Sequence, residues 1–406
     1  MLIGLVGKPS CGKSTFFKAA TLADVLIASY PFATIKPNHG VGYVKVDCLC
    51  KDFKTKCNPQ KGYCVEGKRF VPVELMDVAG LVEGASEGKG MGNQFLDELR
   101  QANAFIHIVD VSGETDGKGE STKNYDPSDD ILMLENELDL WYAGILKKVW
   151  KSFARTIEVS KEDFSKAVAK QFSGLKVCES DVKGVVREGN FDFRVASKWD
   201  DVVLKKFASE LRKKTKPMII AANKIDLPDG KKNYKKIKEK FSDLNIVPCS
   251  ADSELALREA TKLNLIEYIP GERNFETKGE LNDNTLPSRS EGKGTRQKQA
   301  LENIKKNVLD VFGSTGVQEV LNKTVFELLK YIAVFPAGAN KLADSKGNVL
   351  PDCFLLPKGS TALDFAYVIH SDLGDNFIKA IDARTKKAVG KDYELKHRDG
   401  LEIITR

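Results

Sequence analysis

Residues 7–14, G-K-P-S-C-G-K-S, combine glycines, a lysine and a serine in the spacing of a phosphate-binding loop. Gly7 and Gly12 permit a tight backbone path that turns successive N–H groups toward a polyphosphate. We expect Lys13 to contact the β- and γ-phosphates and Ser14 to offer its hydroxyl oxygen to Mg²⁺. The predicted nucleotide-contacting residues of the loop are Gly7, Lys8, Pro9, Ser10, Cys11, Gly12, Lys13, Ser14 and Thr15.

Such a loop needs a strand before it and a helix after it, and the flanking residues predict both. The apolar run L-I-G-L-V at residues 2–6 predicts the strand, and T-F-F-K-A-A at residues 15–20 predicts the start of the helix. The positive end of that helix would then face the phosphates. The alternative is a glycine-rich turn that matches by accident, which befalls on the order of one chain of this length in a hundred.

A second motif supplies a carboxylate and a glycine for the ion and the terminal phosphate. Residues 70–80, F-V-P-V-E-L-M-D-V-A-G, predict a strand that ends at an acidic residue and then a glycine. Asp77 would face the same crevice as the phosphate loop and hold Mg²⁺ through water. Gly80 would let its backbone N–H approach the γ-phosphate. The glycine-rich stretch at residues 81–92 is expected to be a switch loop.

One hydroxyl stands between two prolines in S-Y-P-F-A-T-I-K-P-N, residues 29–38. In a nucleotide switch, Thr34 would give its oxygen to Mg²⁺ and order this loop while the triphosphate is intact. Taken alone, Thr34 fits an ordinary turn better, so the switch role depends on its place between the two motifs. The predicted magnesium ligands are Ser14, Thr34 and Asp77, and the predicted catalytic residues are Lys13, Thr34 and Gly80.

A third motif, N-K-I-D, ends the apolar segment P-M-I-I-A-A at residues 217–222. The Asp226 carboxylate can accept two hydrogen bonds from guanine, while Asn223 reaches the purine edge and Lys224 packs against the base. Adenine lacks that donor pair and would leave a buried carboxylate unpaired. The segment V-P-C-S-A supplies the last two predicted nucleotide contacts, Ser250 and Ala251. The three motifs in this order are specific to the GTPase class.

The position after D-x-x-G bears on the rate of hydrolysis. Small GTPases commonly place a water-orienting glutamine there, and this chain has Leu81. Leucine cannot hydrogen-bond a water. We therefore expect slow intrinsic hydrolysis unless another residue, a backbone group, a monovalent cation or a partner positions the nucleophile.

Composition restricts the remaining classes. With 406 residues, 42% of them hydrophobic and 30% charged, the chain is long enough for two or three domains. No apolar run approaches the roughly 18 residues that span a bilayer, and the N-terminus shows no signal-peptide pattern. We therefore expect a cytoplasmic protein with no membrane partner. The net charge of +6 permits contact with nucleic acid without arguing for it.

Four of the eight cysteines crowd into residues 48–64, C-L-C-K-D-F-K-T-K-C-N-P-Q-K-G-Y-C. Cys48, Cys50, Cys57 and Cys64 could supply four thiolates to a structural Zn²⁺ across an Asn-Pro turn. The spacing lacks C-x-x-C pairs, so a disulfide-linked hairpin and a reduced hairpin compete with the zinc hypothesis.

The rest of the chain predicts an α/β fold with a helical insertion and a C-terminal module. F-I-H-I-V-D-V predicts a buried strand in which His107 is a core residue. D-P-S-D-D predicts the start of the helical insertion, whose apolar stripes would form the seams between its own helices. The predicted boundaries are 1–334 for the nucleotide-binding domain, 126–214 for its helical insertion, 252–312 for an excursion and 335–406 for the C-terminal module.

Three segments carry a family resemblance: P-F-A-T-I-K-P-N-H-G, D-V-A-G-L-V-E-G-A and G-K-G-M-G-N-Q-F-L. They resemble the Obg superfamily of translation-factor-class GTPases, in the archaeal form of its YchF-like branch. The C-terminal L-P-K-G-S-T-A-L-D-F-A-Y-V-I-H-S-D-L-G resembles a ubiquitin-like TGS domain. The resemblance implies a Ras-like P-loop G domain with a mostly parallel sheet and helices on both faces, hydrolysis of GTP or ATP, and ribosome association. It also implies that Thr34 is the switch threonine.

The chain departs from the family pattern at three places. Bacterial and eukaryotic YchF-like proteins carry an N-x-x-E that lets ATP bind, whereas this chain ends the motif with Asp226, which should restore guanine preference. Many relatives have a phosphate-loop asparagine that helps to bind K⁺, and Ser10 stands there in this chain, which leaves potassium activation in doubt. Those relatives also have a histidine before the helical insertion, and residues 112–128 contain none.

These features predict a monomeric, Mg²⁺-dependent GTPase that hydrolyses GTP to GDP and phosphate and acts as a ribosome-associated switch. Two alternatives stay open. One is a nucleotide-stabilised platform whose TGS domain binds RNA or protein with negligible hydrolysis, and the other is an ATPase like other YchF-type proteins. The basic residues expected to contact ribosomal RNA or protein are Lys379, Arg384, Lys386, Lys387, Lys391, Lys396 and Arg398.

Overall fold

The computed structural model describes residues 1–21, 39–78, 80, 83–84, 99–278, 291–338, 342–344 and 346–406, with the side chains of 291–296 excluded. The chain forms two compact units. The first comprises Met1–Ala19, Asn38–Gly40 and Glu74–Val320, and the second comprises Ala20–Pro37, Val41–Val73 and Leu321–Arg406. The second unit thus joins a segment of the N-terminal half to the C-terminal residues, a grouping absent from the predicted boundaries.

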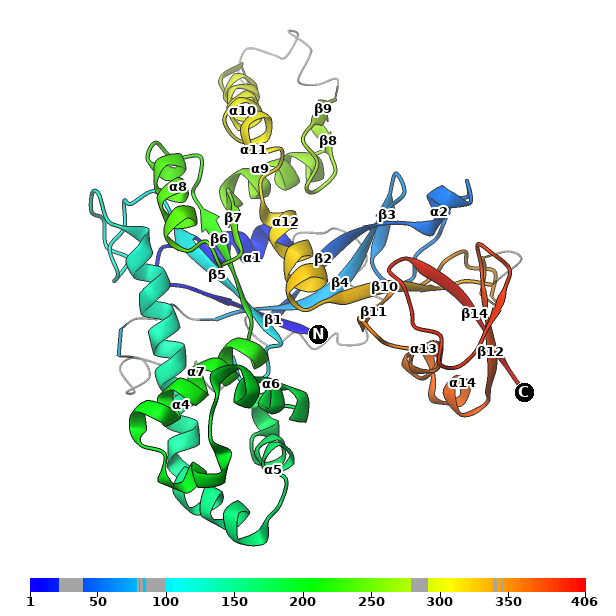
Figure 1. The fold of residues 1–406 in the computed structure, drawn as a ribbon. Coiled ribbons are helices and arrows are strands. Elements are labelled where there is room, and N and C mark those ends of the chain that lie inside the picture. The colour runs from blue at the N-terminus through cyan, green and yellow to red at the C-terminus, as the bar shows by residue number, and fades with distance from the viewer. Residues whose placement is uncertain are drawn as a thin grey trace. The chain divides into compact units, whose positions relative to one another are not determined.

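A largely parallel sheet carries the nucleotide motifs (Figure 1). Its strands in the described part of the chain lie in the order β2-β4-β1-β5-β6-β7, and β3 pairs with β4. They are β1 (Leu2–Val6), β2 (His39–Asp47), β3 (Tyr63–Val65), β4 (Lys68–Asp77), β5 (Ala104–Asp110), β6 (Met218–Asn223) and β7 (Ile246–Pro248). β1 runs parallel to β4 and β5, and β6 runs parallel to β5 and β7. The carboxyl ends of these strands therefore meet at one edge of the sheet, where ligands bind in open α/β folds.

Burial explains why the central strands read as continuous apolar runs. Every residue of β1 and of β5 is buried, as in parallel sheets covered by helices on both faces. The helices and short segments that follow these strands in the first unit are α1 (Lys13–Thr21), α8 (Gly230–Lys240), α9 (Ala251–Lys262), β8 (Ile266–Tyr268), β9 (Phe275–Thr277), α10 (Glu291–Ile304), η6 (Lys305–Leu309) and α11 (Asp310–Phe312). The predicted mostly parallel α/β fold is confirmed.

A helical region lies between β5 and β6 in the chain. Its elements are α4 (Pro127–Ser160), α5 (Phe164–Gln171), η3 (Ser173–Leu175), α6 (Glu179–Gly189), η4 (Phe193–Lys198) and α7 (Asp201–Thr215). Asp126 caps α4 by accepting a hydrogen bond from Ser128 N at 2.9 Å. In the interior, the Trp150 ring lies 5.3 Å from Trp199 and 5.5 Å from Phe207, measured between ring centroids. The apolar stripes of these helices thus pack against one another, as the sequence predicted.

The second unit contains a five-stranded sheet in the order β11-β10-β14-β12-β13 within the described residues. Its elements are α2 (Leu49–Asp52), α12 (Val317–Asn322, which begins in the first unit), η7 (Lys323–Leu328), β10 (Tyr331–Pro336), β11 (Phe354–Pro357), α13 (Ala362–Ile369), α14 (Ser371–Asp375), β12 (Phe377–Asp382), β13 (Ala388–Val389) and β14 (Asp399–Thr405). Thr361 and Asp364 form a capping box at the start of α13. The fully buried Phe365 of α13 then packs into the core of this sheet.

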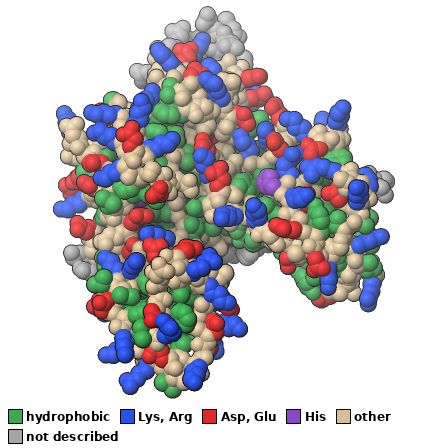
Figure 2. Space-filling model, viewed as in Figure 1, with side chains coloured by type: hydrophobic (Ala, Val, Ile, Leu, Met, Phe, Trp, Pro, Cys, Tyr) green, Lys and Arg blue, Asp and Glu red, His purple; other side chains and the backbone are tan. Residues whose placement is uncertain are grey.

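On the face shown in Figure 2, acidic and basic side chains are interspersed, and no single basic surface dominates. This mixture agrees with a net charge of only +6. Among the described residues, no helix is both long and apolar enough to span a membrane.

Candidate nucleotide-binding site

The loop between β1 and α1 has the tight path that its glycines permit. Gly12 has a φ of +94°, and a Cβ at this position would lie 2.3 Å from the Asn223 side-chain nitrogen. A Cβ on Gly7 would lie 2.5 Å from the carbonyl oxygen of Ile108. Both glycines are therefore required by close approach as well as by backbone conformation. The neighbouring Ser10 is exposed and also has a positive φ, of +59°.

The lysine of the loop is folded back over its backbone. Lys13 Nζ donates to the carbonyl oxygens of Gly7 at 3.1 Å and Lys8 at 2.9 Å, and the side chain is buried. Hydrogen bonds from an ammonium to a charged phosphate are stronger than those to neutral carbonyls. The Lys13 ammonium is thus held at the loop by partners that a phosphate can replace.

Two side-chain oxygens that could act as Mg²⁺ ligands lie next to each other beside the phosphate loop. Ser14 Oγ donates to Asp77 Oδ2 at 2.9 Å, because β4 lies next to β1 with Leu5 opposite Asp77. A hydroxyl and a carboxylate are the hard ligands that Mg²⁺ prefers. Gly80 lies against the loop, since a Cβ there would come within 2.9 Å of Pro9. Thr34, the third predicted ligand, lies outside the described residues, as does Leu81.

A cavity of about 260 Å³ brings the phosphate loop and the N-K-I-D motif together. Its lining residues are Gly12, Thr15, Asn223, Lys224, Asp226, Leu227, Ser250, Ala251 and Asp252. The amide of Asn223 connects the three motifs, with Nδ2 donating to Cys11 O at 2.9 Å and Oδ1 accepting from Ala251 N at 3.0 Å. An amide nitrogen carries two hydrogens, so the second hydrogen of Nδ2 can still serve a ligand.

Lys224 is fixed by a carboxylate that sequence reasoning missed. It has a φ of +62°, and its Nζ lies 2.6 Å from Asp110 Oδ2. Burial acts to raise the pKa of Asp110, but hydrogen bonds from Lys224, Ser112 and Thr115 outweigh it and hold this pKa below its usual value. Asp110 therefore stays ionised and positions Lys224 beside the cavity. Its place at the end of β5, equivalent to that of Asp77 at the end of β4, was the available signal.

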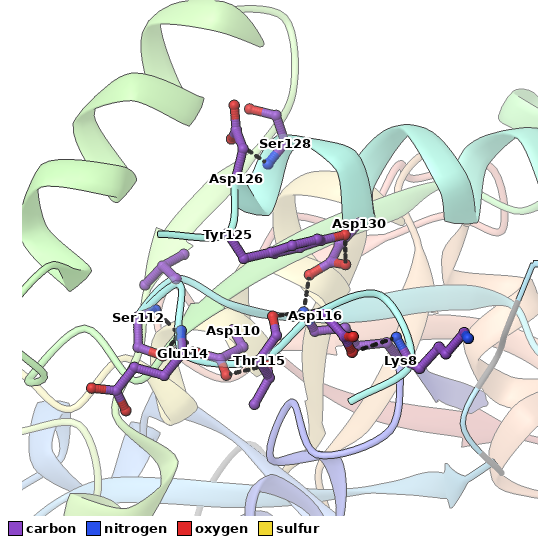
Figure 3. Close-up of polar contacts among 12 residues, drawn as sticks. Lys8, Asp110, Ser112, Glu114, Thr115, Asp116, Tyr125, Asp126, Ser128 and Asp130 are labelled. Atoms are coloured by element: carbon purple, nitrogen blue, oxygen red, sulfur yellow. Dashed lines mark hydrogen bonds and ion pairs between the residues drawn. The ribbon is translucent and has the colours of Figure 1, made fainter. Parts of the chain in front are cut away.

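Lys8 belongs to a buried network rather than to the solvent-facing side of the loop (Figure 3). Its Nζ forms an ion pair with Asp130 at 2.9 Å and donates to Thr115 O at 2.7 Å. The ammonium also lies 4.2 Å from the centroid of the Tyr125 ring. Lys8 is only 1% exposed, so its side chain is committed to these partners and its backbone remains as its contribution to the nucleotide loop.

The network brings the first turn of α4 and the segment before it onto the phosphate loop. Asp130 lies in α4, and Tyr125 donates to Asp130 Oδ1 at 3.0 Å. A Cβ on Gly119 would lie 2.7 Å from Pro9 O, so this segment passes directly against the loop. The D-P-S-D-D sequence indicated a helix start at Asp126 and gave no sign of this second contact.

The comparisons with known proteins agree with the motifs. Residues 2–137 match a family described as 50S ribosome-binding GTPase, residues 221–338 match the Obg-like GTPase YGR210-like, G4 motif-containing domain, and residues 336–405 match the TGS domain. A GTP-binding protein of Methanocaldococcus jannaschii is 47% identical over 405 residues, which cover 100% of this chain and 99% of that protein. Ribosome-binding ATPase YchF of Bacillus subtilis is 29% identical over 392 residues, covering 93% and 87%. The chain belongs to the YchF-type Obg-like GTPases.

A solved structure extends the likeness to three dimensions for this YchF-type Obg-like GTPase. The crystal structure of a GTP-binding protein from Pyrococcus horikoshii is 41% identical, covers 100% of both chains and has a TM-score of 0.78. The family resemblance inferred from the motifs, including the C-terminal TGS domain, is confirmed.

Two groups of predicted residues lie in the second unit of this YchF-type protein. The four cysteines come together, with their Sγ atoms all within 4.8 Å of one another. Two of the basic residues expected to contact the ribosome, Arg384 and Arg398, also pair with Asp52, at 2.9 Å and 2.8 Å. Their contact with the ribosome stays a prediction.

Proposed function

We propose that this YchF-type GTPase hydrolyses GTP to GDP and phosphate and acts in the cytoplasm, as a monomer, as a nucleotide-dependent switch on the ribosome. The observation that carries the proposal is the 260 Å³ cavity that Gly12 of the phosphate loop shares with Asp226. One nucleotide can place its base in this cavity while its phosphates follow the loop. The Asn223 amide holds both regions in register.

The chain's own groups fit phosphoryl transfer. Ser14 and Asp77 would hold Mg²⁺, whose charge would offset the negative charge that develops on the phosphate oxygens. Lys13 would leave the loop carbonyls for the β- and γ-phosphates, and the Gly80 N–H would approach the γ-phosphate. Thr34 remains the predicted third magnesium ligand.

The choice of base is the first point to test, because relatives named ribosome-binding ATPase raise ATP as the alternative substrate. Asp226 supports guanine, since its carboxylate needs the paired N1–H and amine donors that adenine lacks. Calorimetric titration of the Mg²⁺-loaded protein should show GTP binding at least ~10²-fold more tightly than ATP. Equal affinities would overturn the assignment of guanine.

A cavity in the second unit supports contact with ribosomal RNA. It has a volume of about 710 Å³ and is lined by the exposed Lys330, Lys358 and Lys396 together with the rings of Phe326 and Tyr331. Lysines and aromatic rings suit the phosphates and unstacked bases of RNA. Relatives whose names include ribosome binding support the same partner.

Turnover and sedimentation with ribosomes test the switch against the alternative of a nucleotide-stabilised platform. We expect ribosomes to raise the slow intrinsic GTPase rate and co-sedimentation to fall steeply with salt. A Lys358→Ala/Lys396→Ala variant should sediment less, while Lys151→Ala, an exposed lysine of α4 outside the cavity, should match wild type. Negligible turnover with and without ribosomes would instead favour the platform.

A further inference from the structure

Four thiols converge in the second unit from separate parts of one segment. Cys48 precedes α2, Cys50 lies within it, Cys57 lies in the following loop and Cys64 lies in β3. Cys48 Sγ is 3.9 Å from Cys57 Sγ, and Cys50 Sγ is 3.9 Å from Cys64 Sγ. All four are free cysteines, and all their Sγ atoms lie within 4.8 Å of one another.

These separations fit a metal better than a pair of disulfides. Thiolates bound to a tetrahedral zinc at about 2.3 Å stand about 3.8 Å from one another. Two of the Sγ separations are 3.9 Å, and the others lie within 4.8 Å. A disulfide needs its sulfurs roughly 2.0 Å apart. In addition, the thiols do not separate into two isolated pairs, since each Sγ lies within 4.8 Å of the other three. Two disulfides would not require that mutual approach.

We propose that Cys48, Cys50, Cys57 and Cys64 bind one structural Zn²⁺ through four thiolates. Cys48 and Cys50 are buried, and Cys57 and Cys64 are half-buried. Four protein ligands complete the tetrahedron and leave no position for water or substrate, as in structural rather than catalytic zinc sites.

A buried cation next to the cluster supports the same assignment independently. Arg69 is 0% exposed, and it pairs with Cys64 across β3 and β4. Its Nη2 donates to Leu350 O, but Nε and Nη1 have no hydrogen-bond partner among the described residues. Four thiolates and one Zn²⁺ carry a net double negative charge. Such a site would compensate a buried guanidinium that otherwise lacks a full set of partners.

The cluster holds a segment that the C-terminal module contacts. The ten residues between α2 and β3 form no helix or strand in the described structure. Within them, Asn58 N donates to Val349 O at 3.1 Å and Asn58 Oδ1 accepts from Val349 N at 2.6 Å. Gln60 N donates to Pro351 O at 2.8 Å. The zinc would therefore fix the backbone that makes these hydrogen bonds.

Metal analysis of the purified full-length protein tests the assignment. We expect about one zinc per chain, and a Cys57→Ser/Cys64→Ser variant should lose it. Cys178→Ser is the matched control, because Cys178 is exposed at the start of α6 and outside the cluster, and it should keep the zinc. Iron in place of zinc, or metal-free wild type with two disulfides by mass spectrometry, would overturn the proposal.

Wild-type protein provides a second test in case the serine variant fails to fold. Protein purified with Co²⁺ should show the sulfur-to-cobalt charge-transfer band and the visible bands of a tetrahedral thiolate site, and Zn²⁺ should abolish both. After chelation, four additional thiols should become reactive toward a thiol reagent. Absence of the charge-transfer band in folded, cobalt-treated protein, with no zinc bound beforehand, would refute the site.

Discussion

Asn223 donates a 2.9 Å hydrogen bond to the carbonyl oxygen of Cys11, 212 residues earlier in the chain. The same side chain accepts from Ala251 N at 3.0 Å and is buried. One amide therefore sets the position of the phosphate loop relative to the base cavity, so the site depends on a residue that need not itself recognise the nucleotide.

Substitution of Asn223 should weaken the binding of every nucleotide. Asn223→Ala leaves the buried Cys11 carbonyl and Ala251 N–H without their partner, which costs about 1–3 kcal/mol for each unsatisfied group. We expect GTP and GDP affinities to fall together by at least ~10-fold. Asn136→Ala, at an exposed position of α4, is the control. Unchanged GDP affinity in Asn223→Ala would contradict the positioning role.

Substitution of Asp226 should change which base is bound. Asp226→Asn replaces an acceptor with an amide donor, so guanine loses its partner while the C2 carbonyl of xanthine gains one. GTP affinity should fall by at least ~10²-fold and XTP affinity should rise. Asp229→Asn, just before α8 and outside the cavity, should leave the preference for GTP intact. Parallel titrations with the two nucleotides measure the exchange.

Breaking the Lys8–Asp130 ion pair should strongly destabilise the folded protein. Lys8→Met leaves the Asp130 carboxylate buried without its cation, which costs about 3–5 kcal/mol in the free energy of unfolding. Burial already raises the pKa of Asp130, so the loss should shrink as the pH falls and the carboxyl takes up a proton.

Urea unfolding of two further variants checks this interpretation. Lys8→Met/Asp130→Asn should recover part of the stability, because the second change removes the uncompensated charge. Lys147→Met breaks an exposed pair with Asp201 and should have little effect. If Lys8→Met and Lys147→Met lowered the free energy of unfolding equally, the buried pair would contribute no more to stability than the exposed pair.

His107 should make the nucleotide-free protein sensitive to acid. Burial, with Lys13 and Lys8 nearby, lowers the pKa of His107 from 6.5 to about 3. Between these values the unfolded chain binds a proton that the folded chain does not, so stability is full above pH 6.5 and falls toward pH 3. The limit of this loss is roughly 5 kcal/mol. His107→Gln should flatten that part of the pH–stability curve, whereas His370→Gln, at an exposed site, should not.

Arg69 should tune the zinc site without touching the metal. Arg69→Met removes the buried positive charge beside Cys64, and outer partners of metal ligands typically contribute 10–100-fold in affinity. Competition with a chromogenic chelator should show a loss of about that size. Arg194→Met, at an exposed arginine paired with Asp192, should bind zinc as wild type does. Identical affinities in the two variants would contradict a compensating role for Arg69.

Short sequence motifs predicted those parts of the nucleotide site whose residues lie close together in the chain. The phosphate loop, Asp77 and Asp226 were predicted because each stands at a fixed spacing within a few residues of a strand end. Asp110 stands at a strand end as Asp77 does, but its pairing with Lys224, like that of Asp130 with Lys8, joins residues more than 100 positions apart. No periodicity or spacing encodes such a pairing.

The second unit shows the same limit. The ion pairs of Arg384 and Arg398 with Asp52, more than 300 residues earlier, were not predicted. For the cysteines, the irregular spacing did not decide between a zinc site, a disulfide-linked hairpin and a reduced hairpin. The antiparallel register of β3 with β4 and the turn of α2 bring together thiols that the linear pattern leaves scattered.

The contact between Lys8 and Asp130 also has a consequence for displacement. Asp130 lies in the first turn of α4, which continues to Ser160, so about 45 Å of helix extends beyond the contact at 1.5 Å per residue. If a bound phosphate moved the loop enough to tilt α4 by about 5° at Asp130, the far end of a rigid helix of that length would be carried about 4 Å. A small change beside the phosphates would then displace Ser160 by about the width of a side chain.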